Sequence, residues 1–234
     1  SGGPVFALSE QQLLEKLKFV PIFTIVDQKG NPLLLSIKSQ KDVGFLNFYF
    51  DADLAQQTMK AFQAQNPQQA KNYRIGVINL SQAYQAAISE RKKNNTKVRF
   101  QFLSSTKDIQ TATELAKKQD PKFKDNFAGV PVFFVVGGEK KGILTINKDG
   151  KEILPMFFSE ADLQNDLNQL RLRRNDLPKS LSVQVATLDS VVGTMLSGKN
   201  DADSAKITFF PSRSALTYVQ TLIKNAPKPA AKKP

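Results

Sequence analysis

The sequence predicts a mixed α/β (α+β) fold built from two internally repeated halves, each a mixed sheet with packed helices, related by a pseudo-twofold axis. Three observations support this. Apolar runs of strand length alternate with helical patterns along the whole chain. Four segments recur in the same order, roughly 110 residues apart. The chain has 234 residues, of which 41% are hydrophobic, and this is enough for a sizeable core.

The repeat is clearest where "FVPIFTIV" (19–26) returns as "GVPVFFVV" (129–136). The two prolines lie 131 − 21 = 110 residues apart. Three further matches pair "FDADL" (50–54) with "FSEADL" (158–163), "RIGVINL" (74–80) with "SVQVATL" (182–188), and "KVRFQF" (97–102) with "KITFFP" (206–211), the last aligning Phe100 with Phe209. Four ordered matches favour an internal duplication over chance.

The first half is expected to begin with a helix over 9–17 that carries a Ser-x-x-Gln cap. Strands follow at 19–26, 33–37 and in the aromatic run 45–50. A helix capped by Asp51 or Asp53 then carries the apolar stripe Leu54, Met59 and Phe62, and ends before Pro67. The strand 74–80, a helix capped at Ser81, the strand 98–103 and a helix over 106–118 complete this half.

The second half repeats this order, with strands at 130–136, 143–146 and 156–158. Ser159 and Asp162 are spaced as a helix cap, and Leu163, Leu167 and Leu170 follow on one face. The strand 182–188, a helix capped at Asp189, the strand 207–211 and a helix over 213–224 follow. We therefore divide the chain into a flexible N-terminus with a cleavage scar (1–8), two halves (9–118 and 119–223), and a disordered basic tail (224–234).

The composition argues against an enzyme, a metal site and a bound cofactor. The chain has no cysteine and no histidine, so it lacks thiolates, the usual general base and the commonest metal ligand. The paired acids Asp51/Asp53 and Glu160/Asp162 stand in the first turns of predicted helices, where carboxylates cap free N–H groups. We predict no catalytic residues.

The net charge of +12 raises the question of an anionic partner. The basic residues are dispersed over many loops, and no nucleic-acid-binding motif frames them. We therefore predict no nucleic-acid partner, and at most a peripheral contact with an anionic membrane or an acidic protein. The sequence also lacks an apolar run long enough to span a membrane.

The aromatic residues are more informative, because 17 phenylalanines occur in dense runs. Alternation in "FLNFYF" places Leu46, Phe48 and Phe50 on one face of a strand, and Phe45, Asn47 and Tyr49 on the other. Either a helix or the other half covers the second face, or each half carries an apolar groove for extended polypeptide. The polypeptide-binding residues predicted on the second interpretation are exposed aromatic and apolar side chains, namely Phe48, Tyr49, Phe50, Met156 and Phe157.

Four motifs resemble the twenty-two-kilodalton Tic family, and they stand in the family's order: "FAGVPVFFV", "KEILPMFFSEADLQNDL", "LSVQVATLDSVV" and "ITFFPSRSALTYVQ". The resemblance covers about Ser9 to Leu222 and is most specific from Phe127 to Leu170. It implies a non-enzymatic, chaperone-like factor that passes precursor polypeptides across an aqueous space between two membranes. That space is the chloroplast intermembrane space in plants and the periplasm in cyanobacteria, and the chain resembles the cyanobacterial type more.

The partners that the resemblance implies are unfolded precursor or outer-membrane proteins and an Omp85-type assembly or import channel. The function would then be protein transport in outer-membrane biogenesis, by a soluble or peripheral protein. The alternative is a structural adaptor that docks on an outer-membrane assembly channel through its basic surface and never contacts the client.

Overall fold

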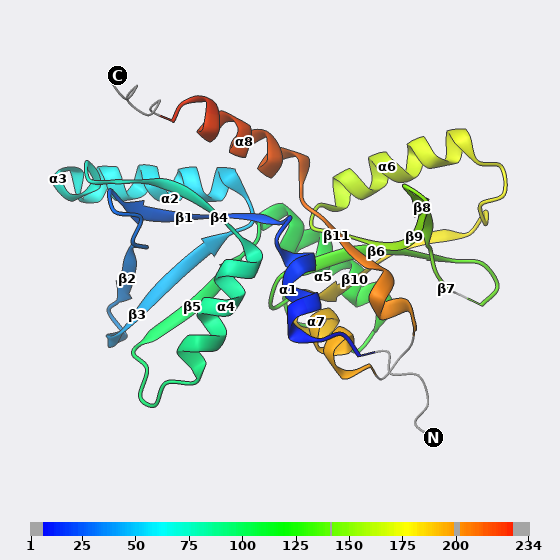
Figure 1. Ribbon diagram of the computed structural model, residues 1–234, viewed down its shortest axis with the longest axis horizontal. Coiled ribbons are helices and arrows are strands. Elements are labelled where there is room, and N and C mark those ends of the chain that lie inside the picture. Colours follow the sequence, from blue (N-terminus) through cyan, green and yellow to red (C-terminus); the bar gives the residue numbers. More distant parts are fainter. Residues whose placement is uncertain (1–6, 141, 199–201, 227–234) are drawn as a thin grey trace, which may run out of the picture.

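The computed structural model describes residues 7–140, 142–198 and 202–226, and it shows two sheets side by side with helices between and around them (Figure 1). This confirms the predicted mixed α/β class. The expected flexible N-terminus and disordered tail fall mainly on residues 1–6 and 227–234, outside the described residues. The described helices are α1 (Glu10–Leu17), α2 (Ala52–Gln65), α3 (Pro67–Ala70), α4 (Leu80–Arg91), α5 (Thr106–Gln119), α6 (Glu160–Arg173), α7 (Leu188–Ser197) and α8 (Arg213–Lys224), with a 3₁₀ turn η1 (Ala202–Lys206).

The first sheet contains β1 (Pro21–Asp27), β2 (Leu34–Ile37), β3 (Gln40–Tyr49), β4 (Tyr73–Asn79) and β5 (Val98–Leu103). β1 pairs with β4 along its full length and with the end of β3, both antiparallel. β5 pairs with β3 in parallel. β4 and β5 each pair with a single strand, so each leaves one edge of the sheet open.

The second sheet contains β6 (Pro131–Gly137), β7 (Gly142–Ile143), β8 (Ile146–Lys148), β9 (Lys151–Phe157), β10 (Leu181–Thr187) and β11 (Ile207–Phe210). β6 pairs antiparallel with β10 and β9, and β11 pairs with β9 in parallel. The second sheet thus repeats the pairing of the first, with β6, β9, β10 and β11 in the places of β1, β3, β4 and β5.

The strand registers fix which residues of the two halves correspond. Pro21 lies opposite Asn79, and Pro131 lies opposite Thr187. Phe48 lies opposite Phe102, and Met156 lies opposite Phe209. The predicted match of Phe100 with Phe209 is therefore wrong by two residues, because the register makes Phe102 the counterpart of Phe209 and Phe100 that of Ile207.

The predicted helix caps are confirmed at three helices and corrected at two. Ser9 forms a capping box with Gln12, Asp51 caps α2, and the Ser159 side chain accepts from the N–H of Asp162. The predicted caps Ser81 and Asp189 are wrong, because Asn79 and Thr187 cap α4 and α7. In both halves the strand runs directly into the helix, so the last strand residue is also the cap.

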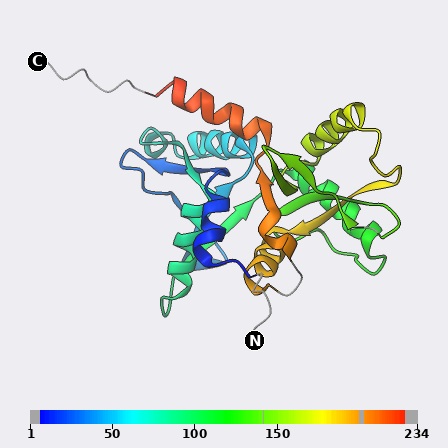
Figure 2. The same cartoon turned by 45° about the vertical axis from the view of Figure 1, so that its right-hand side comes forward.

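The last helix of each half packs on the sheet of the other half. α8 lies along α2 in Figures 1 and 2, contacts β1, and places Tyr218 against Phe23 with ring centroids 5.3 Å apart. α5 contacts β6 and β10, and Ala112 is buried among residues of the second sheet. The corresponding residues Phe50 and Phe158 of the two halves stack on each other, with ring centroids 5.0 Å apart, as expected beside a pseudo-twofold axis. Consequently, neither sheet has a complete core without the helix that crosses to it.

A single apolar core lies between the two sheets. It combines β-strand residues of both halves with side chains of the three helices α1, α4 and α7 between them. The predicted alternation in β3 is confirmed, since Phe48 and Phe50 face this core whereas Tyr49 faces the α2–α8 side. Both faces of β3 are therefore covered at its C-terminal end, one by the other half and one by helices.

Candidate functional site

The five predicted polypeptide-binding residues are all buried. Their exposed fractions are 2% for Phe48, 2% for Tyr49, 8% for Phe50, 4% for Met156 and 7% for Phe157. The expectation that these side chains are exposed was wrong, because the other half and the helices cover both faces of β3 and β9 at the ends where these residues lie. No part of the structure tests whether they contact a client, so their role in binding stays a prediction.

Cavities nevertheless lie beside four of these five residues. Met156 lines a cavity of about 510 Å³ beside α7, and Phe157 lines one of about 760 Å³ between β11 and α8. Phe50 lines a polar cavity of about 270 Å³, where the first turns of four helices meet. Phe48 lies directly beneath the fourth cavity, since it stacks on Phe100 at 5.6 Å and on Phe102 at 5.5 Å.

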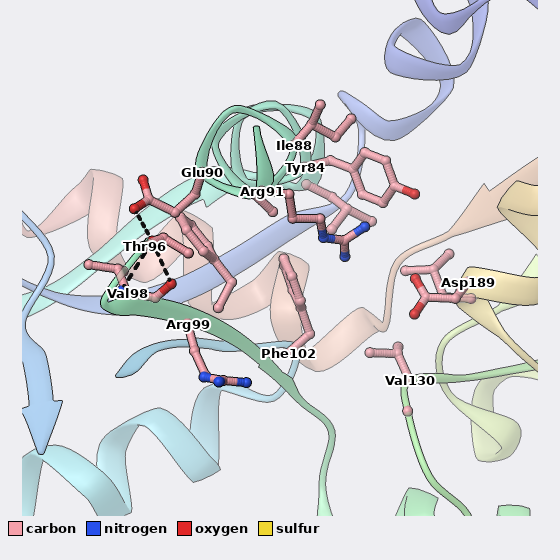
Figure 3. A pocket seen from close by; sticks show the side chains of 15 residues that line it. Tyr84, Ile88, Glu90, Arg91, Thr96, Val98, Arg99, Phe102, Val130 and Asp189 are labelled. Atoms are coloured by element: carbon pink, nitrogen blue, oxygen red, sulfur yellow. Dashed lines mark hydrogen bonds between the residues drawn. The ribbon is translucent and has the colours of Figure 1, made fainter. Parts of the chain in front are cut away.

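This fourth cavity, of about 540 Å³, is the candidate site, and we call it the α4–β5 groove. Its walls are α4, the strand β5, and the segment of the second half formed by Gly129, Val130, Leu188 and Asp189. Figure 3 shows Tyr84, Ile88 and Arg91 projecting from α4, with Phe102 below them and Val130 and Asp189 across the opening. The volume lies within the range of about 300–1,000 Å³ usual for ligand sites.

Local sequence explains how the groove walls are positioned. The Asn79 capping box starts α4 immediately after β4, and the N–H of Leu80 donates to the carbonyl of Val20. Leu188 makes the matching bond to Val130 in the second half, and this places Val130 at the groove. Alternation in β5 turns Phe100 and Phe102 towards the interior and leaves Arg99 exposed.

The groove is apolar inside and charged at its rim. Glu90 accepts a hydrogen bond from the Thr96 hydroxyl, which is the main reason why its pKa lies below the ordinary value, with Lys93 adding to the effect. Burial raises the pKa of Tyr84, and the negative charge of Asp189 raises it further. In the described part of the chain, Arg91 and Arg99 form no ion pair.

Two of the acidic residues considered in the sequence accept hydrogen bonds from backbone N–H groups. Asp51 accepts from the N–H groups of Asp53 and Leu54, and Asp162 accepts from the N–H of Arg213. Among residues 7–140, 142–198 and 202–226, no three potential metal-ligating side chains cluster. No helix in the described segments is long and apolar enough to cross a membrane.

Sequence reasoning missed the groove residues Tyr84, Phe100 and Phe102. The alternation in "VRFQF" was a signal for two phenylalanines on one strand face. The alternation could not show that no helix among the described residues covers this edge of β5, because such a helix would have to come from the other half.

The sequence matches the model of the Tic22-like family over residues 2–221. It is 27% identical to "Protein TIC 22, chloroplastic" of Arabidopsis thaliana over 96% of this chain and 76% of that protein. The protein of the same description from Pisum sativum is 24% identical over 89% of this chain and 76% of that protein.

Two solved structures have the same fold. The Anabaena Tic22 structure, described as protein transport, superposes with a TM-score of 0.74 at 26% identity, covering 95% of this chain and 99% of that one. Tic22 from Plasmodium falciparum has a TM-score of 0.72 at 20% identity, covering 92% of this chain and 99% of the other, and shows a shared fold.

Proposed function

The chain belongs to the Tic22-like family, and we propose that it is a non-enzymatic protein transport factor that binds precursor polypeptides in a chaperone-like way. The observation that carries this proposal is the α4–β5 groove, an open, aromatic-lined cavity between the two halves. Apolar grooves of this kind accept polypeptide segments by burying their apolar side chains. The protein transport description of Anabaena Tic22 supports the same function.

We place this activity in an aqueous space between two membranes, either the cyanobacterial periplasm or the chloroplast intermembrane space. The chloroplastic relatives and the Anabaena structure support this placement. The clients would be unfolded precursor or outer-membrane proteins in outer-membrane biogenesis, and an Omp85-type channel would receive or deliver them.

Four of the five residues predicted from sequence keep a part in this proposal. Phe48 supports the groove floor through its stacks on Phe100 and Phe102, and Phe50 stacks on Phe158 at the axis. Met156 and Phe157 line two further cavities of the second half. We propose that clients contact Phe100, Phe102 and Tyr84 in the groove, and that the buried residues beneath hold these in place.

The test is suppression of aggregation. A urea-unfolded outer-membrane barrel precursor is diluted into buffer with and without the protein, and light scattering is followed at low and moderate salt. We expect suppression that survives added salt, because burial of apolar surface is not screened by ions. Ile88→Arg, which puts a charge into the groove, should weaken suppression.

The matched control is Leu196→Arg on α7. Leu196 corresponds to Ile88, since the caps Asn79 and Thr187 correspond and 196 − 88 = 187 − 79 = 108. The control should retain suppression. The alternative is an adaptor that docks on an assembly channel through its basic surface. It predicts that neither the wild type nor a variant suppresses aggregation, and that binding to the channel weakens as salt is added.

A further inference from the structure

The leading helix α1 makes the two halves unequal. α1 contacts α7, α4 and β11, and its Leu13 and Leu17 are fully buried in the shared core. The corresponding stretch of the second half, just before β6, spans residues 120–130 and forms no helix. A pseudo-twofold copy of α1 would contact α4, α7 and β5.

The α4–β5 groove occupies the place of this missing copy. The core cluster that holds Leu13 and Leu17 of α1 also contains Leu188, Val192, Met195, Ile207 and Phe209, which lie on α7 and β11, two of the elements that α1 contacts. Their counterparts, by the strand registers and the helix caps, are Leu80, Tyr84, Ala87, Phe100 and Phe102. All five counterparts line the α4–β5 groove. The groove is therefore the second half's α1 site repeated in the first half, with no helix of the described chain in it.

The outer edges of β5 and β11 differ too, because α1 contacts the edge of β11 only. Lys16 of α1 donates to the carbonyls of Ala205 and Ile207, at 2.9 and 2.7 Å, on the open edge of β11. The N–H of Gly44 donates to Lys97 and that of Phe50 to Leu103, so ladder alternation points the backbone of Phe100 away from β3. In the described part of the chain, the Phe100 carbonyl has no donor corresponding to Lys16.

The charges at the rim differ too. Lys206 is the counterpart of Arg99 and is paired with Glu152 at 3.5 Å and Asp203 at 3.1 Å. Arg99 and Arg91 form no such pair within residues 7–140, 142–198 and 202–226. Figure 3 shows Arg91 extending from α4 towards the groove opening. An occupant that brings a carboxylate to Arg91 would complement this rim.

We propose that the α4–β5 groove binds an amphipathic helix of a transported protein, with leucine-type residues spaced as Leu13, Leu14 and Leu17 of α1 and a carboxylate facing Arg91. This inference rests on the proposed transport function and names the segment of the client that is recognised. The chain's own α1 shows how such a helix fits, because α1 packs on α7 and β11, which are the counterparts of the groove walls α4 and β5.

The probe is a fluorescently labelled synthetic peptide of residues 7–20, "ALSEQQLLEKLKFV", with blocked ends. Its binding to the intact protein is followed by fluorescence anisotropy. We expect saturable binding that Ile88→Arg weakens at least tenfold and that Leu196→Arg leaves unchanged. A peptide with Leu13, Leu14 and Leu17 replaced by serine should not bind.

Two peptide variants test the helix and the charge. Leu14→Pro, which breaks a helix but permits an extended chain, should abolish binding. Binding retained by the proline peptide would mean that an extended strand, not a helix, pairs with β5. Replacement of Glu10 and Glu15 by glutamine should weaken binding to the wild type but not to Arg91→Gln; equal weakening in both would refute the carboxylate contact.

The inference is overturned if the peptide does not bind at about 1 mM protein, or if Ile88→Arg and Leu196→Arg bind it equally. These outcomes are separable from failure of the proposed function. Aggregation suppression that persists, and that Ile88→Arg still weakens, would leave the transport function standing with a non-helical client segment. Peptide binding without any suppression would instead support a docking role for the groove.

Discussion

Replacement of Phe48 by alanine is expected to destabilise the protein severely, because this side chain is part of the shared core. Phe48 is 2% exposed and stacks on both Phe100 and Phe102. Truncating a buried phenylalanine costs about 3–5 kcal/mol, from lost apolar burial and the cavity left behind. A domain of this kind is stable by only about 5–15 kcal/mol.

The assay is equilibrium urea unfolding followed by far-ultraviolet circular dichroism, with a thermal melt beside it. At about 2–4 °C per kcal/mol for a chain of this length, the melting temperature should fall by roughly 6–20 °C. Phe19→Ala is the control, since that side chain is 76% exposed and its loss should cost less than about 0.5 kcal/mol. A loss below about 1 kcal/mol for Phe48→Ala, together with weaker client binding, would refute the core assignment.

Three further changes test the packing between the halves. Lys16→Met leaves the carbonyls of Ala205 and Ile207 without their donor and should cost about 1–3 kcal/mol in urea unfolding; an unchanged midpoint would mean that water replaces the ammonium. Residues 9–118 alone lack α8 and should show no cooperative melt, whereas mixing them with 119–226 should restore one; a cooperative melt of 9–118 alone would contradict the exchange of helices. Burial raises the pKa of Asp108 above 3.8, so stability should fall as pH rises from below 3.8 through the raised value, and Asp108→Asn should remove this fall when unfolding is compared at about pH 4 and about pH 7.

Much of the fold could be predicted because its signals are local. Ser9, Asp51 and Ser159 cap helices as their spacing indicated, and β3 alternates as "FLNFYF" indicated. The predictions failed where one residue belongs to both a strand and a helix cap, and where strand register decides which residues of the two halves correspond. Asn79 ends β4 and caps α4 at once, so a cap expected after the strand was placed two residues late.

The candidate site could be predicted only in part. The phenylalanine runs drew attention to residues that prove to be buried, and of these Phe48 lies beneath the groove through its stacks on Phe100 and Phe102. The groove wall itself comes from both halves, with Tyr84 and Phe100 on one side and Val130 and Leu188 on the other. No sequence window contains both sides, so periodicity could not reveal which face stays open.

The sequence alone determined the duplication, the alternation of strands and helices, and a composition without cysteine or histidine, because these are properties of residue order and type. The tertiary structure decided three other features: the burial of Phe48 and Phe50, the exchange of α5 and α8, and the packing of α1 on α7 and β11 of the other half. The physical reason is that a side chain is buried only where another segment of the chain packs against it. Two halves with the same local pattern differ wherever a distant segment covers one and leaves the other open.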